Sequence, residues 1–106
     1  MRCKSRCDMK GLLSFQILWL LSKRPMYGNE IAEEIEKRRG EKPKAGTIYP
    51  ALKELKNNGL INGKKKGKII VYSLTETGQF DVKEAIEYFC RSFGDIIKDN
   101  VKTNKN

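Results

Sequence analysis

Histidine is absent from this 106-residue sequence, and cysteine and proline are scarce, with three residues each. Without histidine, a serine or cysteine nucleophile lacks its commonest general base. Cys3, Cys7 and Cys90 fall short of the four ligands that a structural zinc site usually takes, and no glycine-rich phosphate loop occurs. We therefore expect no enzyme, no catalytic residue, no metal and no cofactor.

Long hydrophobic runs are also missing. The longest apolar segment, residues 12–21, is interrupted by Ser14 and Gln16 and is shorter than the ~20 residues that a bilayer span requires. The first ten residues are too polar for a secretory signal, and an odd number of cysteines does not make a disulfide framework. These features predict a cytoplasmic protein with no membrane partner.

Positive charge is what the sequence has in excess. Lysine and arginine number 22 against 13 acidic residues, so the formal net charge is +9. Residues 42–68 contain eight lysines and a single acid, Glu54, and thus carry seven of the nine net charges. A basic segment of this kind points to a polyanionic partner such as nucleic acid, whereas a solvated surface is the alternative.

Apolar spacing predicts two helices before residue 40. Residues 11–23 are apolar around nearly the whole helix, so this helix must be covered on all sides. Residues 24–28 break it, because Pro25 disfavours a helical residue before it. Asn29 is a good N-cap for a second helix, which Gly40 ends.

The segment 44–60, KAGTIYPALKELKNNGL, predicts a third helix with two distinct faces. Pro50 fits its expected first turn, where backbone amides have no partner within the helix. Gly59 is placed to end the helix in a left-handed conformation. The apolar arc that holds this helix to a core contains Ile48, Ala51, Leu52 and Leu55.

A hairpin and a last helix follow. Residues 60–63 and 69–74 read as two strands around a glycine-flanked lysine loop. Thr75 can cap a helix that runs to about Asn100. The expected fold is mainly α with a small two-stranded β-wing. It divides into a flexible basic tail at 1–9, a winged helix-turn-helix domain at 10–74, a C-terminal dimerisation helix at 75–100 and a disordered tail at 101–106.

Apolar positions in the last helix are spaced by four, three, four and three residues, as in an a/d seam. Little of so small a domain is left for this seam to pack on, so we expect a homodimer, with packing on its own domain as the alternative. The expected interface residues are Leu13, Ile17, Val82, Ile86, Phe89, Phe93 and Ile96. We prefer core or dimer packing as the role of Phe15 and Trp19. The alternative role is to line an effector pocket.

In a winged helix-turn-helix, the third helix enters the major groove and the wing lies against the neighbouring DNA backbone. Lysines and hydroxyls on the third helix can then reach phosphates or base edges, and Asn57 is a candidate for adenine. The wing lysines neutralise phosphates, and a solvated surface is the alternative for each lysine. The expected DNA-binding residues are Lys44, Thr47, Tyr49, Lys53, Lys56, Asn57, Lys64, Lys65, Lys66 and Lys68.

Four blocks in this order resemble the PadR family of transcriptional regulators: Tyr27-Gly28, residues 46–52 (GTIYPAL), residues 59–61 (GLI) and residues 72–78 (YSLTETG). The resemblance runs from Lys10 to Phe93. It implies a homodimeric winged-helix repressor that binds a near-palindromic double-stranded DNA operator and is often released by a small-molecule effector. It also implies that the C-terminal helix is the dimerisation element. By the same resemblance, Thr47, Tyr49, Pro50 and Lys53 map onto the recognition-helix motif, and Tyr27 onto a tyrosine near the DNA backbone.

The sequence departs from the family pattern in places. Asn29 stands where the family commonly has an aromatic residue. The wing is short and rich in lysine, which suggests phosphate binding more than minor-groove reading. The first seven residues have no family counterpart.

Two other functions fit the residues. A winged helix does not by itself dictate DNA binding, so a protein- or RNA-binding module is one alternative. A metal- or redox-responsive regulator that works through Cys3, Cys7 and Cys90 is the other. Cys90 neighbours the seam residue Phe89, although the role of a small buried apolar residue suits it as well.

Overall fold

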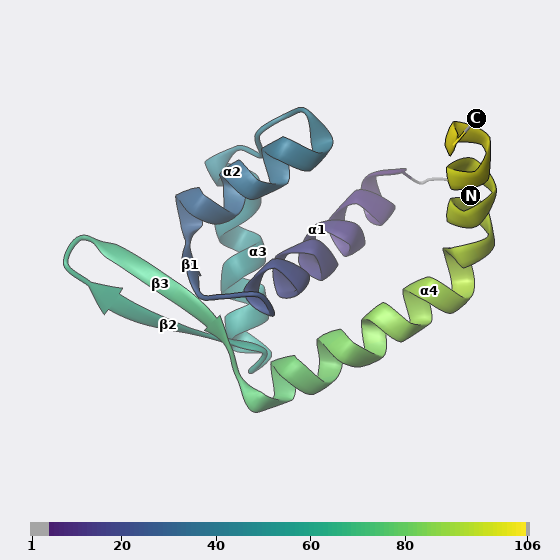
Figure 1. Ribbon diagram of the computed structural model, residues 1–106. Helices are drawn as coiled ribbons and strands as arrows, with labels where there is room; N and C mark the ends of the chain where they lie inside the picture. The colour runs from purple at the N-terminus through teal and green to yellow at the C-terminus, as the bar shows by residue number, and fades with distance from the viewer. Residues whose placement is uncertain (1–4, 106) are drawn as a thin grey trace.

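The computed structural model describes the backbone of residues 5–105 and the side chains of residues 12–100. Figure 1 shows α1 at the centre with α2 above it, a hairpin projecting to one side and α4 running along the opposite edge. The fold is mainly helical with a small antiparallel wing, as expected. The elements are α1 (Ser5–Leu21), β1 (Met26–Tyr27), α2 (Gly28–Arg39), α3 (Ala45–Asn57), β2 (Ile61–Lys66), β3 (Ile69–Leu74) and α4 (Glu76–Lys105).

Both terminal helices are longer than expected. The first begins at Ser5 instead of residue 11, and α4 continues past Asn100 to Lys105. Helical residues thus extend into both segments that were expected as tails. Cys3 and the side chain of Cys7 lie outside the described residues.

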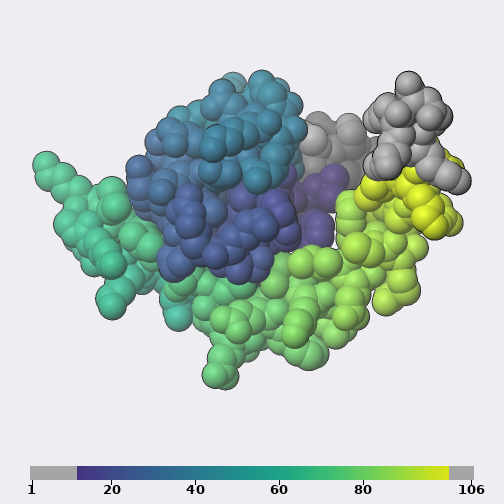
Figure 2. Space-filling model, viewed as in Figure 1, coloured from purple at the N-terminus to yellow at the C-terminus, as the bar shows by residue number. Residues whose placement is uncertain are grey.

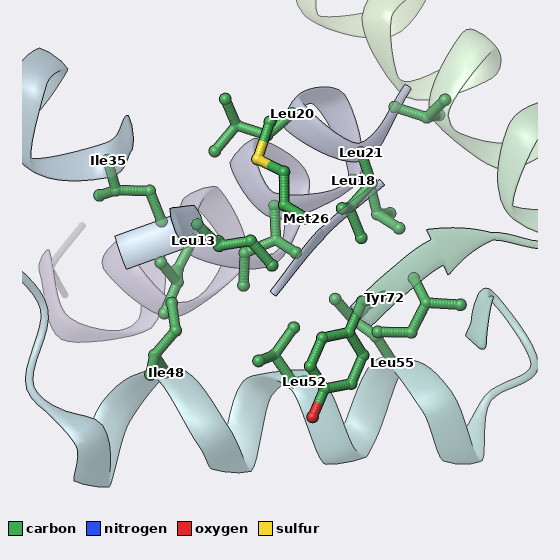
Figure 3. Packing of buried hydrophobic residues seen from close by; sticks show 14 residues of the cluster. Leu13, Leu18, Leu20, Leu21, Met26, Ile35, Ile48, Leu52, Leu55 and Tyr72 are labelled. Atoms are coloured by element: carbon green, nitrogen blue, oxygen red, sulfur yellow. The ribbon is translucent and has the colours of Figure 1, made fainter. Parts of the chain in front are cut away.

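One hydrophobic core joins the helices to the sheet. Figure 3 shows α1 side chains directed toward Ile48, Leu52 and Leu55 of α3, with Tyr72 of β3 beside them. Among the described side chains, no polar or charged one is buried. The core is therefore held by apolar burial, which contributes about 25 cal/mol per Å² of apolar surface removed from water.

The chain itself covers most of α1. This helix contacts α2, α3, α4 and β3, which explains why it is apolar nearly all round. Leu13 and Ile17 are 4% and 0% exposed, so their expected place at a subunit interface is corrected: both belong to the core. Leu12 remains 47% exposed.

The sheet has three strands, where the sequence predicted two. Its order is β1-β3-β2, and β1 adds the pairs Met26↔Tyr72 and Tyr27↔Val71. The hairpin of β2 and β3 closes through Gly67 and Lys68, between the paired residues Lys66 and Ile69. Gly67 has φ 63° and no non-glycine residue described has a positive φ, which is the sign pattern of a type II′ turn.

The start of α2 differs from the expectation. Tyr27, not Asn29, is the N-cap residue, and its backbone N–H donates to Glu30 Oε1 at 3.0 Å. Asn29 lies in the first turn, where its Nδ2 donates to Glu33 Oε2 at 3.1 Å. The expected end of the helix is confirmed, because Gly40 has φ 83° and its N–H donates to the Glu36 carbonyl.

The end of α3 and the start of α4 are tied together. Gly59 has φ 77°, and the Leu60 N–H donates back to the Leu55 carbonyl at 3.0 Å, which confirms the expected left-handed end. Thr75 is confirmed as a cap, since its Oγ1 accepts from the Gly78 N–H at 2.9 Å. The same hydroxyl donates to the Gly59 carbonyl at 2.6 Å. These bonds fix where the wing leaves the domain.

Candidate nucleic-acid interface

The third helix has the two faces that its sequence predicts. Ile48, Leu52 and Leu55 are between 1% and 4% exposed and pack in the core. The other face is open to solvent. Its exposed residues include Thr47, Tyr49, Pro50, Lys53, Lys56 and Asn57, and Lys44 precedes them as the exposed N-cap residue; Glu54 is the one acid exposed on this helix.

Pro50 lies deeper in α3 than expected. The helix begins at Ala45, so Pro50 is its sixth residue and not part of the first turn. A proline there cannot donate to the carbonyl four residues earlier, which belongs to Gly46. Gly46 is exposed, and water can therefore satisfy its carbonyl.

The first turn of α3 suits an anion. It contains no acidic residue, and its unpaired amides form the positive end of the helix dipole. Nothing lies within 4 Å of the place where a Cβ on Gly46 would stand. This leaves room for a phosphate to approach the backbone at Gly46.

The wing lysines lie in a strand and not in a loop, which corrects the sequence prediction. Lys64, Lys65 and Lys66 are exposed residues of β2, and only Lys68 lies in the turn. Successive strand residues point to opposite faces, so Lys65 shares the face of Ile70 while the other two lie on the reverse face. Figure 2 shows the wing projecting from the body of the molecule.

These lysines have no acidic partners. The ion pairs among the described residues join Arg24 to Glu30, and Lys37 and Arg38 to Glu34. None of them involves a lysine from residues 42–68. No ion pair among the described residues therefore neutralises the positive charge of this surface.

Three tyrosines lie near the start of α2. Tyr27 is half-buried in β1, Tyr49 of α3 is 47% exposed, and Tyr72 of β3 is 9% exposed. Burial, and secondarily the proximity of Tyr49, raises the pKa of Tyr72. By their exposure, Tyr49 belongs to the same open face as the lysines of α3, whereas Tyr72 belongs to the core.

The apolar seam of α4 becomes more exposed toward the C-terminal end of the helix. Val82 is 4% exposed within the chain's own core, so its expected interface role is corrected. Ile86 and Phe89 are half-buried, and the Phe89 ring lies 5.5 Å from that of Phe15 on α1. Phe93 and Ile96 are 44% and 60% exposed. The first half of the seam packs on its own domain, and the second half is uncovered.

A groove of about 460 Å³ lies between α1, α2 and α4. Both residues proposed for an effector pocket, Phe15 and Trp19, line it. The guanidinium of Arg38 lies 5.0 Å from the Trp19 ring centroid, and its bond to Glu34 is the main cause that lowers the pKa of that carboxyl. Arg38 could not be expected here from sequence patterns, because the contact joins residues of two different helices.

In the described part of the chain, no helix combines the length and the apolar character needed to cross a membrane. No group of three potential metal ligands occurs among the same residues. Cys90 is an exposed free thiol, which corrects its reading as a small buried residue.

Comparison with known proteins agrees with this geometry. Three solved structures are similar over most of the chain. A PadR-like transcription factor from Bacteroides fragilis has 26% identity and a TM-score of 0.73, covering 90% of this chain and 95% of its own. RosR of H. salinarum has 26% identity and a TM-score of 0.71, covering 88% and 91%. A PadR family transcription regulator from Clostridium difficile has 25% identity and a TM-score of 0.69, covering 84% and 97%.

Comparison with curated proteins gave no match. The model of the transcriptional regulator PadR-like family matches residues 17–84, which is more than half of the chain. That range contains α2, α3 and both wing strands. The chain therefore belongs to the PadR-like family of transcriptional regulators.

Proposed function

We propose that this chain is a cytoplasmic transcriptional repressor that binds a near-palindromic double-stranded DNA operator as a homodimer. The observation that supports this most is the exposed face of α3, where Lys53 and Lys56 stand beside hydroxyl and amide groups without an acidic partner. A helix presented in this way fits the major groove. The wing lysines add contacts to phosphates, which raise affinity more than selectivity.

The homodimer is supported by the second half of α4. Phe93, Ile96 and Ile97 are between 44% and 60% exposed, although their spacing is that of a helix-packing seam. In a two-fold dimer, the same residues of α4 in both copies would face each other and bury these side chains. The interface in this proposal therefore uses Phe93 and Ile96, with Ile86 and Phe89 at its edge.

An effector site is supported by the groove beside Trp19. Its volume falls within the ~300–1,000 Å³ that is usual for small-molecule sites. A molecule in the groove would touch α1 and α4 together. Because α4 carries the proposed dimer contacts, such binding would alter the distance between the two recognition helices.

A double variant tests the proposed role of α3 in DNA binding. We expect the Lys53→Ala, Lys56→Ala double variant to fold and dimerise but to lose sequence-selective binding to duplex DNA. Lys98→Ala is the matched control, because Lys98 is exposed on α4, away from α3. Equal affinity of the double variant and the control for DNA would remove α3 from the proposed role.

A further inference from the structure

Gly28, the first residue of α2, is buried beneath the ring of Tyr49 from α3. A Cβ atom built on Gly28 would lie 2.6 Å from Tyr49 Oη, 2.8 Å from Cε1 and 2.9 Å from Cζ. Real Cβ atoms do not make contacts this short, so any side chain at this position would displace the ring. Glycine is not needed for the backbone here, since Gly28 is not among the described residues with a positive φ, which are Gly40, Gly59 and Gly67. Glycine is required at position 28 because any side chain there would occupy the space of the Tyr49 ring.

The sheet also lies close to the contact between Gly28 and Tyr49. Met26, two residues before Gly28, pairs with Tyr72 of β3, and proximity to Tyr49 is one of the causes that raise the pKa of Tyr72. Figure 3 shows the Tyr72 hydroxyl directed toward α3. A Cβ on Gly63 would in turn lie 3.4 Å from Tyr72 Cε1. The Tyr49 ring thus lies where the start of α2, the recognition helix and the base of the wing come together.

We propose that Gly28 is a positioning residue for DNA binding that acts through Tyr49. Because it has no side chain, Gly28 lets the Tyr49 ring lie across the start of α2 and holds the phenol in one orientation. Tyr49 is 47% exposed, so in the proposed complex its ring would meet the DNA already ordered. A ring displaced by a methyl group would have to be ordered during binding, which weakens affinity. This inference rests on the proposed function.

The fold should tolerate the substitution that tests this idea. The atoms that Gly28→Ala would meet belong to the far end of one half-exposed side chain and not to the backbone. The ring can therefore swing outward into solvent. Alanine is also a better helix former than glycine, so α2 is not weakened.

The test is a double-mutant cycle on a duplex first selected with the wild-type chain. Fluorescence anisotropy measures its affinity for the wild type, Gly28→Ala, Tyr49→Ala and the combined variant, at a salt concentration low enough for every variant to bind. We expect Gly28→Ala to weaken binding on the order of 10-fold, by the usual cost of immobilising one side chain in each of two chains. In the Tyr49→Ala background, the same change should have no further effect.

Tyr49→Phe provides the control for the hydroxyl. Its ring keeps the Cε1 and Cζ atoms that conflict with a Cβ at residue 28, so Gly28→Ala should still weaken binding in that background. The proposal is overturned if Gly28→Ala binds as tightly as the wild type, or loses the same factor with and without Tyr49. A large drop in the thermal unfolding midpoint of Gly28→Ala would also contradict the proposal, because it would mean that the ring does not move outward. A wild-type chain that selects no duplex would instead refute the proposed function.

Discussion

The wing supplies a quantitative prediction about the salt dependence of DNA binding. Replacement of Lys64, Lys65 and Lys66 by alanine removes three exposed charges of β2 that have no acidic partner. No buried side chain is changed, so the fold should persist. Strand alternation places two of the three on one face, and we count two phosphate contacts for each chain and four for a dimer.

Each lost phosphate contact makes the slope of log K against log salt shallower by about 0.9, so four contacts make it shallower by about 3.6. Between about 50 and 200 mM salt, the wild type should then lose on the order of 10² more affinity than the triple variant. Anisotropy titrations at several salt concentrations measure both slopes. Lys98→Ala, on α4, should leave the slope unchanged. A triple variant with the wild-type slope would refute the assignment of the wing to the DNA backbone.

Two further predictions concern assembly and stability. Ile96→Asp places a charge on the uncovered half of the α4 seam and should convert a dimer to monomers in light scattering, whereas Lys98→Asp should not; a dimeric Ile96→Asp would contradict the proposed interface. Leu52→Ala empties a site that is 1% exposed and should lower the free energy of unfolding by about 2 to 5 kcal/mol in urea. A loss below 1 kcal/mol would mean that α3 is held by something other than this core.

Much of the fold could be predicted from local patterns. The two faces of α3 follow from apolar spacing at 3.6 residues per turn, and these are the faces observed. Gly40, Gly59 and Thr75 end or begin helices where their chemistry suits that role. Such features depend on residues within one or two turns of each other, which is why sequence alone shows them.

Other features depend on contacts between distant segments. The strand β1 has only two residues, too few to show alternation, and it forms because β3 offers it an edge. Asn29 has the chemistry of a good N-cap, but Tyr27 pairs with Val71 and is the N-cap residue, two residues earlier than expected.

The interface prediction went wrong in part for the same reason. The all-round apolar character of α1 reads equally as a core or as a subunit contact. The structure shows that α4 packs on α1 through Phe15 and Phe89, so Leu13 and Val82 are core residues. The contact of Gly28 with Tyr49 joins residues 21 positions apart in the chain, and no periodic pattern could have indicated it.

Selection of bound sequences from a random duplex library tests the central claim most directly, because it reports DNA binding, symmetry and spacing in one measurement. A symmetric dimer with its two α3 helices in successive major grooves should enrich inverted half-sites whose centres are about 10 to 10.5 base pairs, or roughly 34 to 36 Å, apart. The same selection with the Lys53→Ala, Lys56→Ala variant should enrich nothing. Failure of the wild-type chain to enrich any inverted repeat would contradict the account.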